Sequence, residues 1–259
     1  MRTIALVTRE SGYVRKVMLR NPQALFFMIG WPLLFLLIVG TVSRGKHGHM
    51  PGQPGTLEDS AVLVASVIVI AVVSAAFADL AMFLVRDREE GVLKRLRSTP
   101  VPTRVFLGGH LINALLTSVV LALLVAGLGW GVYGASLPGS HVLAAVVTVL
   151  VGALACCALG FALTIFIRST SAASAVVSAA TLILFFLSGN LVNPVPAAFT
   201  AVANVFPVRH FYQAMVTAFN PNVAGGGFAL GHLGIVALWG AAGLAIAVWK
   251  FRWSPSAER

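Results

Sequence analysis

An all-α membrane protein with six transmembrane helices is the fold class that the sequence predicts. The first observation is composition: of 259 residues, 58% are hydrophobic and only 10% are charged, with a mean hydropathy of +0.92. A soluble domain is nearer half apolar and a quarter charged. The second observation is that the apolar residues gather in long runs, several of which exceed the roughly 20 residues needed to cross a hydrocarbon core.

Six apolar runs predict six spans. A segment inside the hydrocarbon core must satisfy its own backbone hydrogen bonds, so each span is expected to be a helix. Adjacent cysteines in the fourth span are expected to be small packing residues rather than a disulfide framework. The predicted spans are residues 24–43, 59–85, 105–133, 142–167, 172–192 and 228–249.

Lys and Arg residues are distributed unevenly around these spans. Fifteen of the 18 fall in the first 20 residues, after the second span, after the fourth span or in the tail. Cytoplasmic segments of membrane proteins carry such an excess of basic residues. Both termini are therefore predicted to be cytoplasmic. The net charge of +10 follows from this bias and suits anionic lipid headgroups, so it needs no nucleic-acid partner.

Residues 1–21 are predicted to form an amphipathic helix on the inner membrane surface, and residues 22–259 a single membrane domain. At about 100° per residue, basic and apolar side chains fall on opposite lines of the helix. Such a helix lies with its apolar side in the membrane; a disordered basic arm is the alternative. The basic line consists of Arg2, Arg9, Lys16 and Arg20.

Residues 193–227 are predicted to be a re-entrant hairpin on the outer side, between the fifth and sixth spans. Prolines divide this stretch into helices of roughly ten residues, since proline cannot continue a helix. These helices are too short to cross the membrane and carry one formal charge, Arg209. Backbone of this kind is tolerated at membrane depth only where protein buries it.

Charges concentrate in the loop after the second span. A helix over residues 86–97 would place Asp87, Glu90, Lys94 and Arg97 on one face, with Glu90 and Lys94 at the favourable i, i+4 spacing. The Ser-Thr-Pro-Val-Pro sequence that follows stops such a helix, because the residue before a proline prefers an extended backbone. A short, rigid, two-faced helix of this kind predicts a protein partner.

The tract RDREEGVLKRLRSTPVP, residues 86–102, resembles the cytoplasmic signature of ABC-2 type transporter permeases, in which an acidic pair precedes Gly, Leu, basic residues and Thr-Pro-Val. Residues 20–22, Arg-Asn-Pro, are similar to the family's entry to its first span. Residues 206–214, FPVRHFYQA, are similar to its outer re-entrant motif. The resemblance covers the whole chain and points to drug-exporting members such as daunorubicin-type permeases. Two departures are His110, where Lys or Arg is expected, and Phe206, where a polar residue is common.

The resemblance implies that the 86–102 tract is a coupling helix that docks on a separate ATPase subunit. Two ATPase copies would hold ATP and Mg, while this chain binds no cofactor. A second permease copy, or a homologous permease, would complete the pathway for a hydrophobic drug, antibiotic or lipid in a bacterial cytoplasmic membrane. The residues carried over as ATPase-coupling are Asp87, Glu89, Glu90, Gly91, Leu93, Arg95, Leu96, Thr99 and Pro100.

The residues themselves agree that the energy comes from another chain. No GxxxxGK[ST] phosphate-binding loop is present, and the only Gly-Lys pair, Gly45-Lys46, continues with His47.

Asp79 is the one acid well inside an apolar run, and an intramembrane acid is a functional candidate by default. It lies two turns before Arg86, so pairing with a basic neighbour or contact with water is the structural alternative. Aromatic residues near the outer side suit an amphipathic cargo, although such residues also serve packing. The candidates for a substrate path or gate are Asp79, Phe185, Asn190, Phe206, Arg209 and Phe211.

Three other functions are weaker. A lipid-linked polysaccharide exporter would keep the family and change the cargo, but calls for a longer aromatic ladder. An ion-coupled carrier would need charged relays at mid-membrane and internal repeats. An intramembrane enzyme or a metal site would need paired acids, an activated nucleophile or a ligand cluster. Four histidines lie on different segments, mostly near membrane boundaries, and are expected to be interfacial residues: His110, His141, His210 and His232.

Overall fold

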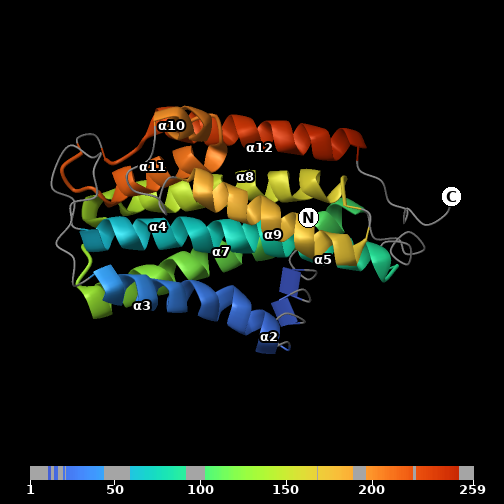
Figure 1. Cartoon of the computed structure of the whole chain (residues 1–259), viewed down its shortest axis with the longest axis horizontal. Coiled ribbons are helices and arrows are strands. Elements are labelled where there is room, and N and C mark those ends of the chain that lie inside the picture. Colours follow the sequence, from blue (N-terminus) through green and yellow to red (C-terminus); the bar gives the residue numbers. More distant parts are fainter. Residues whose placement is uncertain are drawn as a thin grey trace.

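The computed structural model describes residues 11–12, 15–16, 20, 22–43, 59–91, 103–167, 169–188, 197–223 and 226–250. These residues form a bundle of long helices that run side by side (Figure 1), and the described part contains no strand. The helices are α2 (Pro22–Leu25), η1 (Phe26–Gly30), α3 (Trp31–Ser43), α4 (Asp59–Val73), η2 (Ser74–Asp79), α5 (Leu80–Glu89), α7 (Thr103–Tyr133), η3 (Gly139–His141), α8 (Val142–Thr164), α9 (Thr170–Leu187), α10 (Ala197–Ala203), α11 (Pro207–Phe219) and α12 (Leu230–Lys250).

Several of these helices match the predicted spans. Four are long and apolar enough to cross a membrane, and they correspond to spans two, three, four and six. Shorter apolar helices, Met28–Val42 and Ser171–Leu187, lie at spans one and five. The all-helical, multi-pass class is therefore confirmed, while the count of six spans stays a prediction. The four long helices are Asp59–Glu89, Val105–Tyr133, Gly139–Thr164 and Leu230–Trp249.

Two π-helical segments interrupt otherwise continuous helices. η1 joins α2 to α3, and η2 joins α4 to α5. A π segment changes the hydrogen-bond spacing from four residues to five and is frequent at functional sites. The two segments contact each other, so the first two helices are both irregular at the same level of the bundle.

The centre of the bundle is α4. Every residue from Ala61 to Val73 is buried, which is typical of a helix that is apolar on all sides and lies inside a larger assembly of helices. α4 packs against α3, α7, α8 and α11. The second span is thus enclosed by protein, whereas α7 and α12 expose most of their apolar surface.

Small residues let α8 approach its neighbours closely. A Cβ atom at Gly160 would lie 2.9 Å from the backbone oxygen of Phe77, and one at Gly243 would lie 3.0 Å from backbone atoms of Ala158 and Leu159. Close backbone approach through small residues is a common basis of helix association in membranes. Cys156 and Cys157, also on α8, are free and buried, which confirms the predicted packing role.

The stretch predicted as a re-entrant hairpin contains two short helices, α10 and α11. Pro207 is the first residue of α11, and Pro221 directly follows its C-cap, Asn220. One face of α11 is buried against α4, α8 and α12. Short helices packed on protein agree with the sequence analysis, while their depth in a membrane stays a prediction. Residues 193–196 and 224–225 lie outside the described part.

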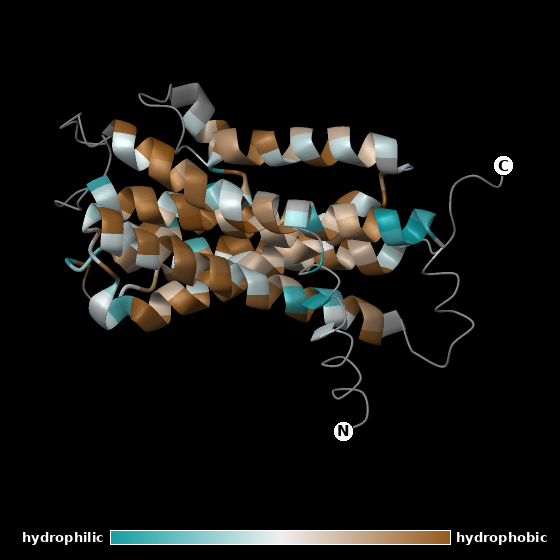
Figure 2. Cartoon of the chain, turned by 90° about the horizontal axis from the view of Figure 1, so that it is seen from below, coloured by the Kyte–Doolittle hydropathy of each residue, from teal (hydrophilic) through white to brown (hydrophobic). Residues whose placement is uncertain are grey.

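The end of α5, the start of α2 and the end of α12 lie at the same end of the bundle (Figure 1), as successive antiparallel spans require. The hydrophilic colour gathers toward the ends of the helices (Figure 2). We call the end that carries residues 86–91 the charged end; it is the one predicted to be cytoplasmic. η3 joins α7 to α8 at the opposite end.

Candidate functional site

The charged end is organised around the last turn of α5. Arg86 Nε donates to Glu90 Oε1 over 2.6 Å, and both side chains are more than half exposed. The helix ends at Glu89, and Gly91 has a φ of +69°. Glycine in this left-handed conformation is the usual residue just after a helix, because it carries no Cβ to clash.

This ending corrects the predicted helix over residues 86–97. Residues 86–89 belong to the second span's own helix, which the left-handed Gly91 terminates, so one uninterrupted helix does not run from 86 to 97. Glu90 pairs backward with Arg86. The predicted partner Lys94 lies outside the described residues, as do Leu93, Arg95, Leu96, Thr99 and Pro100 of the coupling motif.

Arg88 joins α5 to the end of α8. Its Nη1 donates to the backbone oxygen of Thr164 over 3.2 Å, and its Nη2 donates to that of Ile167. The last carbonyls of a helix lack partners within the helix and carry the negative end of its dipole, so a guanidinium there is favourable. No local sequence pattern indicates this role of Arg88, because its partner lies 76 positions away along the chain.

Asp87 joins α5 to α7. Its Oδ2 lies 3.4 Å from Nε2 of His110, which is 6% exposed. This is an electrostatic contact rather than a well-formed hydrogen bond. The ring of Phe106 meets His110 edge to face at a centroid distance of 4.6 Å. His110, noted as a departure from the family's pattern, therefore contacts α5 within this chain. Together Asp87 and Arg88 connect the last turn of α5 to two other helices.

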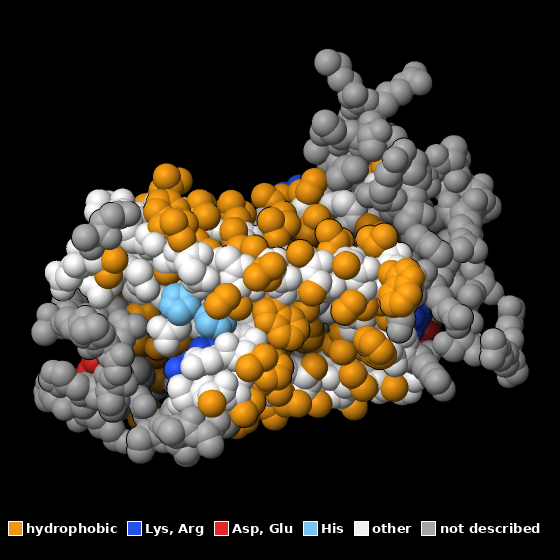
Figure 3. Space-filling model, turned by 90° about the horizontal axis from the view of Figure 1, so that it is seen from above, with side chains coloured by type: hydrophobic (Ala, Val, Ile, Leu, Met, Phe, Trp, Pro, Cys, Tyr) orange, Lys and Arg blue, Asp and Glu red, His pale blue; other side chains and the backbone are white. Residues whose placement is uncertain are grey.

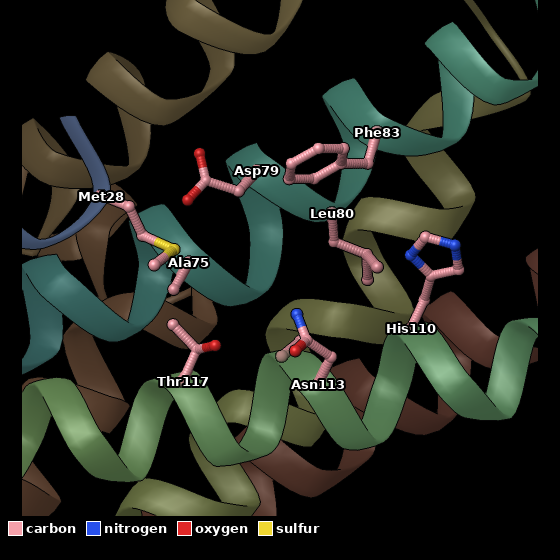
Figure 4. A pocket seen from close by; sticks show the side chains of 9 residues that line it. Met28, Ala75, Asp79, Leu80, Phe83, His110, Asn113 and Thr117 are labelled. Atoms are coloured by element: carbon pink, nitrogen blue, oxygen red, sulfur yellow. The ribbon is translucent and has the colours of Figure 1, made fainter. Parts of the chain in front are cut away.

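A small cavity lies between η1, the η2–α5 helix and α7, deeper in the bundle (Figure 4). The volume open to the centre of a water-sized sphere is about 20 Å³. Asp79 lines it, and Oδ2 of Asp79 is buried without a hydrogen-bond partner among the described residues. Among the described residues no basic side chain pairs with Oδ2 of Asp79, while the residue as a whole is partly exposed, so contact with water stays an alternative role for it.

The remaining gate candidates lie elsewhere. Phe185, on α9, is partly buried against the main core. Phe211 is 1% exposed and fills the space beside Gly152 of α8, where a Cβ would lie 2.4 Å from its ring. Phe206 stacks on Trp239 of α12 at 6.2 Å. Asn190 lies outside the described residues. These aromatic side chains do not form a continuous ladder with one another in the described part.

Arg209 belongs to a polar cluster that joins α11 to α12. On the face seen in Figure 3, histidine side chains lie next to Lys or Arg side chains among hydrophobic ones. Nε of Arg209 donates to Asn204 Oδ1 over 2.6 Å. The Nδ1 atoms of His210 and His232 are 2.8 Å apart, and His210 Nε2 lies 2.8 Å from the backbone oxygen of Asn204. The two histidines lie on different helices, α11 and α12, and their proximity in space could not be predicted, since spacing along the chain does not indicate which helices pack together.

A family model for the ABC-2 type transporter matches residues 4–220. The chain belongs to the ABC-2 type transporter family. A comparison with curated proteins found no match. Membership makes the chain a membrane component of an ABC transporter, and the matched region contains the α5 junction, the cavity and α11. The matched region also contains the 86–102 tract, whose role as a coupling helix stays a prediction.

Of the predicted interfacial helix of this ABC-2 chain, the structure describes only Ser11–Gly12 and Arg15–Lys16 as helical and Arg20 as a turn. Lys16 and Arg20 are exposed, as basic residues facing water or lipid phosphates would be. Arg2 and Arg9 lie outside the described residues, so the helix as a whole stays a prediction.

Proposed function

We propose that this ABC-2 chain is the permease subunit of an ATP-driven exporter that moves a hydrophobic or amphipathic substrate, such as a drug, antibiotic or lipid. A separate ATPase subunit, present in two copies that hold ATP and Mg, supplies the energy. A second permease, identical or homologous, completes the pathway. The membrane is the bacterial cytoplasmic membrane, with the charged end facing the cytoplasm.

The observation that carries this proposal is the connection of the α5 end to its neighbours. The 86–102 tract, from the last turn of α5 toward α7, is where the ATPase docks in the proposal. At the α5 side of this tract, Arg88 binds the carbonyls at the end of α8, and Asp87 contacts His110 of α7. A displacement of the docked segment is therefore passed to three helices at once.

The described spans support a largely apolar cargo. Buried polar side chains are few, and several of the hydroxyl groups among them are satisfied by carbonyls of their own helix, as for Ser66, Ser118 and Thr181. A polysaccharide would need a continuous row of aromatic rings along its pathway. Phe211 is buried in the core and is therefore not available for such a row. The apolar substrate class is accordingly preferred.

The test uses two glycines in the same strained conformation at opposite ends of the bundle. Gly91 has φ +69° and Gly134 has φ +65°, and a Cβ at either would meet nothing within 4 Å. An L-residue in this conformation costs roughly 1–2 kcal/mol, so Gly91→Ala and Gly134→Ala should lose similar stability. Only Gly91→Ala distorts the junction that leads into the docking segment.

The permease and its ATPase are reconstituted together in vesicles, and nucleotide-dependent uptake of a fluorescent amphiphile is measured alongside ATP hydrolysis. Gly91→Ala is expected to lower uptake per ATP hydrolysed about tenfold, a loss of roughly 1.4 kcal/mol of coupling, while Gly134→Ala retains wild-type coupling. Equal coupling in the two variants would contradict the role given to the charged end. Uptake by the chain without an ATPase or nucleotide would overturn the proposed function altogether.

A further inference from the structure

We propose that the cavity between η1, η2 and α7 is the site that receives a single primary ammonium group, so that the exported amphiphile is an amine. This amine would be the substrate class of the proposed exporter. The binding of an amine in the cavity does not depend on the proposed function, and only its role as cargo does.

The first support is an unmet acceptor. Oδ2 of Asp79 is buried and lacks a hydrogen-bond partner among the described residues. A buried carboxyl group without a partner is costly, and such groups in native structures call for an explanation, such as a ligand or an unobserved ion. Asp79 lies ten residues before the end of α5 at Glu89, which places it about 15 Å along the helix at 1.5 Å per residue. An amine headgroup from the nearer leaflet can reach that depth.

The second support is the backbone around the cavity. Met28 comes from η1, while Ala75 and Asp79 come from η2, so both π segments contribute to its wall. π segments occur frequently at functional sites because they re-aim side chains that a regular helix would place elsewhere. In Figure 4 the side chains of Met28 and Asp79 lie close together at one side of the cavity.

The third support is the chemistry of the lining. Three side chains carry oxygen atoms: Asp79, Asn113 and Thr117. A primary ammonium has three N–H donors and no acceptor, so it can donate to the unpartnered Asp79 oxygen in a charge-assisted bond and still offer N–H groups to another oxygen of the lining. Calcium prefers six to eight oxygen ligands and magnesium a near-ideal octahedron, which this lining does not supply. His110 also lines the cavity, but Leu80 lies between it and Asp79 (Figure 4).

The size of the cavity fits one small group. A volume of about 20 Å³ exceeds the 10–15 Å³ that a single water-sized occupant needs, and an ammonium head is similar in size. The hydrocarbon tail leaves past Met28, whose flexible thioether side chain adapts to different shapes. Phe26 and Trp31, on the same helix as Met28, are 55% and 51% exposed, so this helix is the lateral wall between the cavity and lipid.

The test measures binding by the full chain in nanodiscs of phosphatidylcholine, without nucleotide. Three probes share an undecyl chain with a terminal dansyl fluorophore and differ only in the head: primary ammonium, trimethylammonium or hydroxyl. Empty nanodiscs supply the background from partition into lipid. The wild type is expected to bind the ammonium probe about tenfold more tightly than the other two, as one charge-assisted network predicts.

Asp79→Asn is expected to abolish this preference and leave affinity for the hydroxyl probe unchanged. Asp59→Asn is the matched control, because Asp59 is an exposed acid at the opposite end of the same helix, and it should bind all three probes as the wild type does. Unchanged ammonium affinity in Asp79→Asn, or an equal loss for all three probes, would overturn the proposal. Should Asp79→Asn fail to fold, the nearly isosteric Thr117→Val must show a selective loss for the ammonium probe, and equal binding there would also refute the site.

A primary ammonium can come from a free amphipathic amine or from phosphatidylethanolamine. Replacing phosphatidylcholine by phosphatidylethanolamine in the nanodiscs distinguishes them. If the site takes the lipid headgroup, the lipid competes and weakens binding of the ammonium probe to the wild type but not to Asp79→Asn. If the site takes free amines, binding of the probe is unaffected. Probe binding is measured without an ATPase and export in the complex reconstituted with one, so the two proposals can fail separately. Selective probe binding in nanodiscs, together with no nucleotide-driven export by the complex, would refute the proposed function alone. Export with unselective binding would refute this inference alone.

Discussion

Arg88 illustrates how a single side chain can hold the charged end together. Its guanidinium lies between α5 and the carbonyl end of α8, and its planar fork allows it to bond two carbonyl oxygens at once. Arg86, two residues earlier, makes only an exposed ion pair within its own helix. The two residues are only about half a helical turn apart. Their expected contributions to the free energy of unfolding nevertheless differ strongly.

Arg88→Gln should lower the free energy of unfolding by about 2 kcal/mol, because a hydrogen bond from a charged group contributes roughly 1.5–3 kcal/mol. Arg86→Gln should cost at most about 0.5 kcal/mol, as is typical of an exposed i, i+4 pair. The measurement is the midpoint of thermal unfolding in detergent for both variants. Equal midpoints would mean that the α5–α8 contact adds no stability.

Residue identities alone predicted only part of the site. Asp79 stood out because it is the one acid well inside an apolar run, whereas Asp87 and Gly91 were carried over from the resemblance to the family's motif. The contact of Arg88 with Thr164 and the pair His210–His232 depend on which helices are neighbours. Periodicity describes one helix at a time and carries no information about that choice.

At the scale of elements, the helices themselves were predictable and several of their ends were not. Long apolar runs indicate spans directly, and prolines correctly marked the limits of α11. The continuation of the second span to Glu89 was missed, because charged residues inside a helix and charged residues in a loop look alike in sequence. The π segments η1 and η2 also left no signal, since they arise from packing rather than from residue type.

The contact of α8 with α12 gives an element-scale prediction. On α12, a Cβ added at Gly243 would lie 3.0 Å from backbone atoms of Ala158 and Leu159, whereas a Cβ at Gly234 would meet nothing within 4 Å. Valine at 243 must push the helices apart, and such overpacking costs typically 1–3 kcal/mol. Gly243→Val is therefore expected to unfold at a lower temperature than Gly234→Val, which places the same side chain on the same helix in open space.

If Gly243→Val and Gly234→Val unfolded at the same temperature, α8 and α12 could separate to admit the valine with no loss of stability. The transport consequence is separate: if α8 moves with the charged end, as proposed, loosening its contact with α12 should also lower uptake per ATP hydrolysed in the reconstituted complex.

At the scale of the whole molecule, the proposed mechanism depends on which end of the bundle faces the ATPase. α8 has 23 residues and is about 34 Å long at 1.5 Å per residue, enough to cross the hydrocarbon core. Ser140, before α8, and Ser171, in the first turn of α9 after it, are both exposed serines. They lie at opposite ends of the bundle, so they form a matched pair for topology.

Cysteine labelling on intact cells tests the orientation with little background, because Cys156 and Cys157 are buried and the native chain should not react with a membrane-impermeant maleimide. Ser140→Cys is expected to react from outside, and Ser171→Cys only after the cells are permeabilised. The reason is the basic bias of the charged end, which favours retention in the cytoplasm. Labelling of Ser171→Cys on intact cells would put the charged end outside, where no ATP is available. Neither the docking of an ATPase on the 86–102 tract nor the coupling through Arg88 and Asp87 could then operate.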